Sequence, residues 1–136
     1  MSTSHHAVNP WTWQDQFGFA QAISAPPWLF CAGQGPADPD GNVMHPGDIG
    51  AQLTQSLDNL ETVLAQAGTD LSHVVRLNYY TTDVDGLFGV WQSAEGRIIA
   101  ERLQKANCRP AQTLLGVARL AFPDMLIEIE ATALLP

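Results

Sequence analysis

The sequence predicts an α+β fold in which a mixed sheet carries two helices on one face. Two observations favour this class: amphipathic segments with apolar residues at helical spacing, and shorter runs rich in β-branched and aromatic residues. Their order along the chain is β-β-(β)-α-β-α-β-β. The length of 136 residues fits one domain, so we expect a single domain over 1–136. Residues 1–16 are expected to form an N-terminal extension, with Trp11 and Trp13 docked on a neighbour.

The first strands are expected at 17–24 and 28–33, because both runs are aromatic and apolar and a Pro-Pro turn separates them. The segment ADPDGN at 37–42 has the composition of a turn. A short strand around Val43 is expected to follow it.

The clearest helix is expected over 48–67, where apolar residues form one stripe on a 3.6-residue period. Asp48 suits the N-terminus of this helix and Gly68 suits its C-terminal cap. A second helix is expected over 84–104, although Gly96 inside it weakens the pattern. The stripe of the first helix consists of Ile49, Leu53, Leu57, Leu60, Val63 and Leu64.

The later strands are expected at 73–82, 112–120 and 126–134, with the last two joined in a final hairpin. Two helices on one face would leave the other face of the sheet bare. Because the strands are rich in Ile, Leu and Val, we expect that bare face to be apolar and buried against other copies of the chain.

The charge balance argues against two classes of partner. Acidic residues outnumber basic ones 14 to 6, the formal net charge is −8, and Lys105 is the only lysine. Nucleic acids and anionic membranes both require a basic surface, so neither is expected. No apolar stretch approaches the roughly 18 residues that span a bilayer, and the first ten residues lack the apolar run of a secretory signal. Cys31 and Cys108 are far apart and are interpreted as reduced thiols, which favours the cytoplasm.

Two carboxylates mark the last strand as the chemically interesting one. Strict alternation places Glu128 and Glu130 on one face, roughly 7 Å apart along the strand. A carboxylate held in a cleft can have a raised pKa and activate water. The alternative is structural: one or both pair with Arg119, across the predicted hairpin.

Other reactive side chains carry weaker signals. Cys31 has no base or positive charge near it in sequence, so a core thiol is expected rather than a nucleophile. His5 and His6 lack a third ligand, and no metal site is predicted. The glycines of segment 32–35 would let a ligand approach the backbone, and a strand-to-loop turn explains them almost as well.

Three strings of the sequence share the pattern of a known family: HPGDIGAQLTQSLDNLETVLAQAG, VVRLNYYTTDVD and RPAQTLLGVARLAFPDMLIEIEATA. They resemble the RidA family, also called the YjgF family, whose members are often labelled endoribonuclease L-PSP. The resemblance covers about 9–136. It implies a chorismate-mutase-like α+β fold and a homotrimer, in which three sheets form a central barrel and ligand clefts lie between protomers.

The resemblance also implies an activity: cofactor-free hydrolysis of reactive imines and enamines, such as 2-aminoacrylate, to a carbonyl compound and ammonia. Glu128 matches the family's cleft glutamate, and Gly33 matches a cleft glycine. Gln112 stands where the family has an arginine that grips the substrate carboxylate. Three further substrate-binding positions depart from the family pattern, because Phe19 replaces a tyrosine, Ala32 replaces a small polar residue and Leu114 replaces a cysteine.

These departures all remove polarity or charge. Gln112 can donate hydrogen bonds to a carbonyl oxygen but supplies no charge, unless Arg109 turns inward as a substitute. We therefore expect the cleft to prefer a neutral or more apolar ligand. Two functions stay open: a hydrolase of an imine, an enamine or a related carbonyl compound, and a non-catalytic small-molecule-binding or regulatory trimer that has lost deaminase activity. The net charge of −8 argues against the ribonuclease of the family label.

Overall fold

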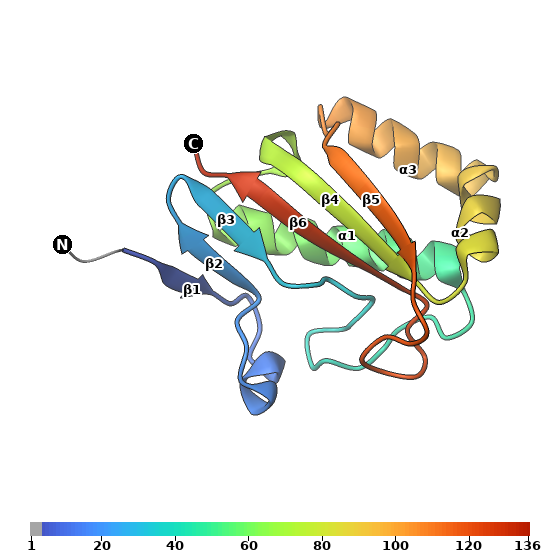
Figure 1. Cartoon of the computed structure of the whole chain (residues 1–136), viewed down its shortest axis with the longest axis horizontal. Helices are drawn as coiled ribbons and strands as arrows, with labels where there is room; N and C mark the ends of the chain where they lie inside the picture. The colour runs from blue at the N-terminus through green and yellow to red at the C-terminus, as the bar shows by residue number, and fades with distance from the viewer. Residues whose placement is uncertain (1–3) are drawn as a thin grey trace.

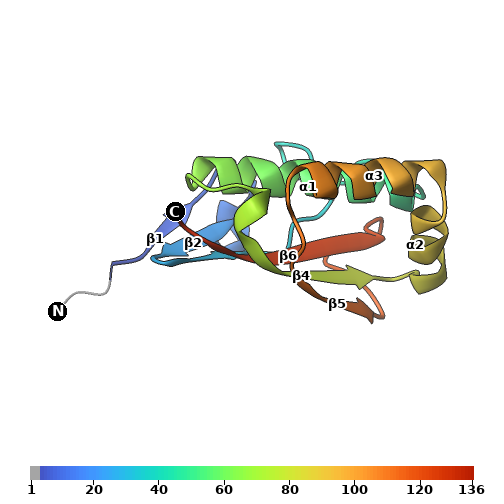
Figure 2. The same ribbon diagram turned by 90° about the horizontal axis from the view of Figure 1, so that it is seen from above.

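The computed structural model describes residues 4–136. Within this range, the chain forms a six-stranded mixed sheet and three α-helices. Figure 2 shows the helices labelled α1 and α3 over one face of the sheet and the helix labelled α2 at its end. The strands are β1 (His6–Val8), β2 (Ala22–Ala25), β3 (Trp28–Cys31), β4 (Val74–Thr81), β5 (Ala111–Gly116) and β6 (Ile127–Leu134), the helices are α1 (Ile49–Gln66), α2 (Val84–Trp91) and α3 (Ala94–Lys105), and short 3-10 turns cover Trp13–Phe17 and Leu71–His73. The predicted α+β class is confirmed, with three helices in place of two.

The strand order is β1-β2-β3-β6-β4-β5 (Figure 1). Strand β6 is antiparallel to both of its neighbours, whereas β5 is parallel to β4. A parallel neighbour requires a crossover connection, and α2 and α3 provide it. The predicted final hairpin is therefore wrong, because β4 lies between β5 and β6. The strand predicted over 112–120 ends at Gly116, and the chain continues as a loop to β6.

Helix α1 forms as its sequence pattern predicts. The Asp48 side chain accepts a hydrogen bond from the Ala51 backbone N–H at 3.0 Å and so caps the N-terminus. Gly68, just after the helix, has the positive φ of 83° that favours glycine. The apolar stripe faces the sheet, and its leucines at 53, 57, 60 and 64 have no exposed surface. No helix within residues 4–136 is both long and apolar enough to cross a membrane.

The segment 84–104 forms two helices where one was predicted. The chain breaks at Gln92 and Ser93, and Ser93 caps α3 by accepting a hydrogen bond from the Gly96 N–H at 3.3 Å. A Cβ atom on Gly96 would overlap the Val90 carbonyl oxygen. Gly96 therefore allows the tight approach of the two helices, which explains why it interrupts the helical pattern.

The N-terminal segment is partly built into the sheet. Strand β1 pairs with β2 in antiparallel register, although no strand was expected within 1–16. The strand expected over 17–24 is shorter, because residues 13–17 form a 3-10 turn that ends at Gly18 with φ of 76°. Trp11 packs against the hydrophobic core of this chain.

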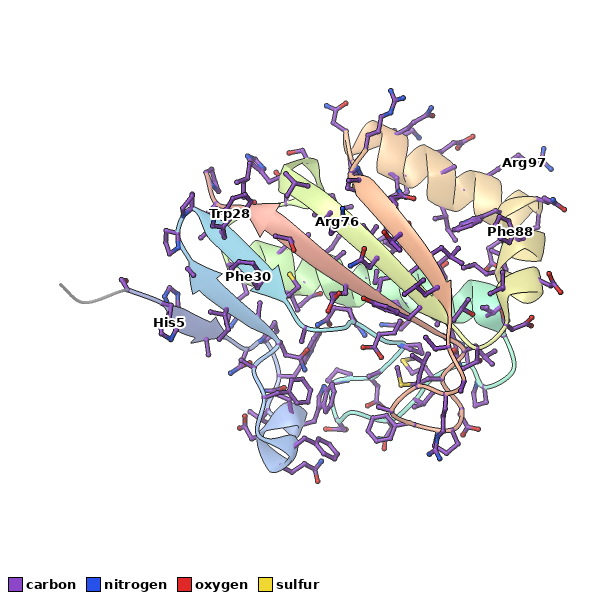
Figure 3. The ribbon with its side chains drawn as sticks, in the orientation of Figure 1. His5, Trp28, Phe30, Arg76, Phe88 and Arg97 are labelled. Carbon is purple, nitrogen blue, oxygen red and sulfur yellow. The ribbon has the colours of Figure 1, made fainter. Side chains whose placement is uncertain are left out.

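The open face of the sheet is mixed rather than apolar. The large aliphatic residues of the central strands point toward the helices, as the buried Ile127 and Ile129 do. The opposite face carries Glu130, Tyr80 and the half-exposed Phe30, which Figure 3 shows on β3 beside Trp28. The predicted bare apolar face is thus corrected: alternation places most aliphatic side chains under the helices, and the open face mixes polar and aromatic groups with exposed aliphatic ones such as Leu115.

Candidate functional site

A cavity of about 350 Å³ lies at one end of the sheet. Three segments enclose it: the 3-10 turn before β2, the loop after β3 and the loop before β6, which Figure 1 shows along the same edge of the molecule. Phe19, Gly33 and Glu128, predicted from the sequence, line this cavity. Of the described residues that line it, Glu128 alone has an ionisable side chain.

Glu128 projects from the open face of β6, where it is paired with Tyr80 of β4. Its side chain is half-buried, and burial raises the pKa of the carboxyl, with a further rise from the negative charge of Glu130. None of the described residues donates a hydrogen bond to this carboxylate. Its oxygens are therefore available to a ligand in the cavity.

Glu130 has a different environment on the same strand face. Its carboxylate accepts hydrogen bonds from the Tyr80 hydroxyl at 2.9 Å and from the Asn78 side-chain amide at 3.1 Å. Arg119 lies on the exposed loop after β5 and forms no ion pair with either glutamate in the described part of the chain. The structural alternative, a pair with Arg119, fails because it depended on the hairpin that does not form.

The glycines after β3 make room for the side chains of the cavity. A Cβ atom on Gly33 would overlap Glu128 Oε1, and a Cβ atom on Gly35 would overlap the Met125 methyl group. The segment is held against β6 by two backbone hydrogen bonds between Gln34 and Ile129, at 2.6 and 3.0 Å. Gly33 thus lets the carboxylate lie directly over the backbone.

Three buried glutamine side chains form a ladder of hydrogen bonds between two of the segments that enclose the cavity. Gln34 donates to Gln21 at 2.9 Å, Gln21 donates to Gln14 at 3.0 Å, and Gln14 donates to the Trp11 carbonyl at 2.7 Å. All three glutamines are at most 3% exposed. The ladder connects the 3-10 turn to the loop beside Glu128. Sequence analysis missed it, because glutamines at 14, 21 and 34 follow no helix or strand period.

The cavity also has an aromatic wall, formed by Trp13, Phe17, Phe19 and Phe122, of which sequence analysis predicted only Phe19. Trp13 contacts Phe19 and Phe17 edge-to-face, with ring centroids 5.6 and 6.2 Å apart. Phe17 contacts Phe122 in the same way at 6.0 Å. The run WTWQDQFGF is a composition signal for part of this wall, whereas nothing in the sequence links it to Phe122.

The other predicted residues lie elsewhere. Ala32 is half-buried next to Gly33 but does not line the cavity. Gln112 and Leu114 lie on the edge strand β5, in register with Leu77 and Tyr79, whose side chains are buried beneath the helices. Within one chain, β4 separates both residues from Glu128, so the structure does not bring them to the cavity.

Cys31 is buried on β3, and burial raises the pKa of its thiol to about 12. A thiol with this pKa stays protonated at neutral pH and is a poor nucleophile. The prediction of a core thiol is confirmed. Within residues 4–136, no cluster of three or more His, Cys, Asp or Glu side chains has the geometry to hold a metal ion.

The comparisons with known proteins agree on one family. The family model described as Endoribonuclease L-PSP matches residues 14–135. A RutC family protein of Pyrococcus horikoshii is 36% identical over 115 residues, 85% of each chain. Protein DfrA of Myxococcus xanthus is 42% identical over 114 residues, which cover 84% of this chain and 81% of that protein.

The solved structures give the same answer. The Rid-family protein YyfA of Yersinia pestis has 28% sequence identity and a TM-score of 0.80, covering 97% of this chain and 100% of that chain. The sequence motifs, the family model and the fold therefore all indicate the same family. The chain belongs to the RidA family, also called the YjgF or endoribonuclease L-PSP family.

Proposed function

We propose that this protein hydrolyses a small reactive imine or enamine to a carbonyl compound and ammonia or an amine, with Glu128 as the acid and base. One observation carries the proposal: a half-buried carboxyl group with a raised pKa and no hydrogen-bond donor among the described residues lines a cavity of about 350 Å³. A carboxyl group of raised pKa exchanges protons at a pH nearer neutrality, as acid-base catalysis requires.

The proposed hydrolysis proceeds through a series of proton transfers to and from Glu128. Protonated Glu128 donates its proton to the imine nitrogen, or to the β-carbon of an enamine, and either transfer gives an iminium whose carbon is electrophilic. Water then attacks this carbon while the Glu128 carboxylate takes a proton from it, and a carbinolamine forms. The carboxyl protonates the nitrogen again, the carbon–nitrogen bond breaks, and the hydroxyl proton returns to Glu128. One water is consumed, ammonia or an amine is released, and no electron is transferred.

A substrate without a carboxylate suits this cavity best. Glu128 is negatively charged once it has donated its proton, and the other lining groups are mostly apolar. Burying a substrate carboxylate beside it, with no cation among the described lining residues, would be strongly unfavourable. Gln112 in the arginine position of the family supports the same preference.

A homotrimer is part of the proposal. Gln112 and Leu114 cannot reach the Glu128 cavity of their own chain, and clefts between protomers would let a second copy supply them. The half-exposed rings of Trp28 and Phe30 on the open face favour burial against another copy. Light scattering should give about three times the chain mass of 14.7 kDa. A folded species near the mass of one chain that survives dilution would overturn this assembly.

A non-catalytic binding or regulatory trimer is the second candidate function. Gln112 in place of the arginine favours it, because the loss of that charge weakens the grip on the family's anionic substrates. The cytoplasmic location expected from the two free cysteines stays a prediction.

The test is an assay of ammonia release from freshly generated imines and enamines, both neutral and anionic. Glu128→Gln should lower turnover by about 10²–10⁴-fold, the usual range for losing a general acid or base. Glu101→Gln, an exposed carboxylate on α3, is the matched control and should keep full activity. Ligand binding without any turnover in the wild type would favour the second function.

A further inference from the structure

We infer that the cavity selects a nitrogen compound with an aromatic side chain, by placing the ring on the aromatic wall and the protonated nitrogen against Glu128. The inference names the substrate class of the site and so rests on the proposed function for its biological meaning. Binding of such a compound can nevertheless be measured without any reaction.

The wall presents aromatic surface in several directions. The edge-to-face contacts have interplanar angles of 65° to 75°, so successive rings from Phe19 through Trp13 and Phe17 to Phe122 turn relative to one another. Rings arranged in this way form a concave surface that contacts a bound group from more than one side. An apolar ring is the group that gains most from such contacts.

Two rings of the wall are notably accessible. Phe17 is 54% exposed and Phe19 is 39% exposed. The wall continues into the Met125 methyl group and the Val43 side chain, so the apolar surface extends across the cavity. A ligand that covers this surface removes apolar area from water, which favours binding.

Electrostatic interactions favour a positively charged nitrogen at the end of the ligand away from the ring. The Glu128 carboxylate attracts a positive charge, and the faces of the aromatic rings attract a cation within about 6 Å. Both effects repel an anion. The recognised nitrogen is therefore an ammonium or a protonated imine, because a neutral group gains less and a carboxylate is rejected.

The volume of the cavity limits the size of the ligand. A cavity of about 350 Å³ falls at the lower end of the range for small-molecule sites. A single ring with a short nitrogen-bearing arm fits this range, whereas a dinucleotide or a peptide does not. Benzylamine is therefore a stable probe that has the expected shape and charge.

The experiment measures the binding of four probes by isothermal titration calorimetry at neutral pH: benzylamine, methylamine, benzyl alcohol and benzoate. Benzylamine should bind at least about tenfold more tightly than each of the others, since each lacks the ring, the charge or the correct sign of charge. Equal binding of methylamine, or tighter binding of benzoate, would overturn the inference.

Variants then assign the two ends of the ligand. Phe122→Ala and the milder Phe122→Leu should weaken benzylamine binding about fivefold or more. Phe88→Ala is the matched control, because Phe88 is 48% exposed on α2 (Figure 3) and does not line the cavity. Glu128→Gln should abolish the preference for benzylamine over benzyl alcohol. Unchanged benzylamine affinity in both Phe122 variants would contradict the role of the wall.

The catalytic function and the binding preference can be tested separately. If benzylamine binds as described and no imine is hydrolysed, the proposed catalytic function fails while the binding preference stands. If imines are hydrolysed at rates independent of their side chain, the function stands and the preference fails.

Discussion

Gly33 owes its importance to an absent side chain, because the Glu128 carboxylate occupies the space that a Cβ atom would need. Gly33→Ala should force the flexible end of Glu128 to rotate away from the backbone. A displacement of about 1 Å in a catalytic group can lower turnover about 10²-fold. Stability should change by less than about 1 kcal/mol, since only the end of a flexible side chain moves.

Turnover and thermal unfolding of the Gly33 variant test this separation. Gly89→Ala on α2 is the matched control, because a Cβ atom there meets no other atom within 4 Å. It should keep full activity and gain a few tenths to about 1 kcal/mol from better helix propensity. A Gly33 variant with normal turnover would show that the carboxylate position is unimportant.

Glu128 should also cost the protein stability at neutral pH. Its pKa is raised in the folded state, so the folded state binds this proton more tightly than the unfolded chain. The resulting stabilisation is full below the unfolded pKa of about 4.3 and is lost as pH rises through the folded pKa. Glu128→Gln should therefore raise Tm at about pH 8, and the gain should shrink toward about pH 4.

Thermal denaturation of wild type and the Glu128 variant across this pH range provides the measurement. The exposed Glu101→Gln variant is again the control. A gain in Tm that is the same at every pH would mean that the substitution acts through packing, and that ionisation of Glu128 is not the cause.

At the scale of elements, the amide ladder joins the 3-10 turn to the loop after β3. Gln21→Leu keeps much of the side-chain volume but removes the central link, leaving polar atoms of buried Gln14 and Gln34 without their partner. Unsatisfied buried groups of this kind cost about 1–3 kcal/mol. Chemical denaturation should show this loss, whereas Gln16→Leu, an exposed residue of the same turn, should change stability little.

The elements that the sequence predicts well are those defined by local periodicity. Helix α1 follows from its apolar stripe, Asp48 and Gly68, and β6 follows from strict alternation around Glu128. The pairing of β6 was mispredicted, because strand partners are chosen by contacts between distant segments. The break before Ser93 was missed for a similar reason, since it depends on the close approach of α2 and α3 at Gly96.

The residues of the candidate site also fall into two groups, those that a sequence motif predicts and those that only contacts between distant segments bring together. Phe19, Gly33 and Glu128 were found through family motifs, and the structure places all of them on one cavity. The aromatic wall joins Trp13 to Phe122, more than a hundred residues apart in the sequence. No local sequence pattern predicts this contact, because it depends on the loop before β6 packing against the 3-10 turn.

At the scale of the whole molecule, Gln112 should influence the site only across a boundary between copies. Gln112→Arg should raise activity on 2-aminoacrylate about ten- to a hundredfold, if the new charge forms a pair of about 1.5–3 kcal/mol with the substrate carboxylate. Strong wild-type activity on this anion, unchanged by the substitution, would point to Arg109 as the group that binds it.

The position of β6 also determines when the molecule can fold during its synthesis. The strand made last of the six lies in the middle of the sheet, between β3 and β4. Until residues 127–134 have left the ribosome, the β1–β3 meander and the β4–β5 pair remain two separate halves with open edges. Those edges are exposed to wrong pairing from the time each half is made until β6 fills the gap between them. Sheet completion is therefore a late event, and the same event brings Glu128 to Gly33.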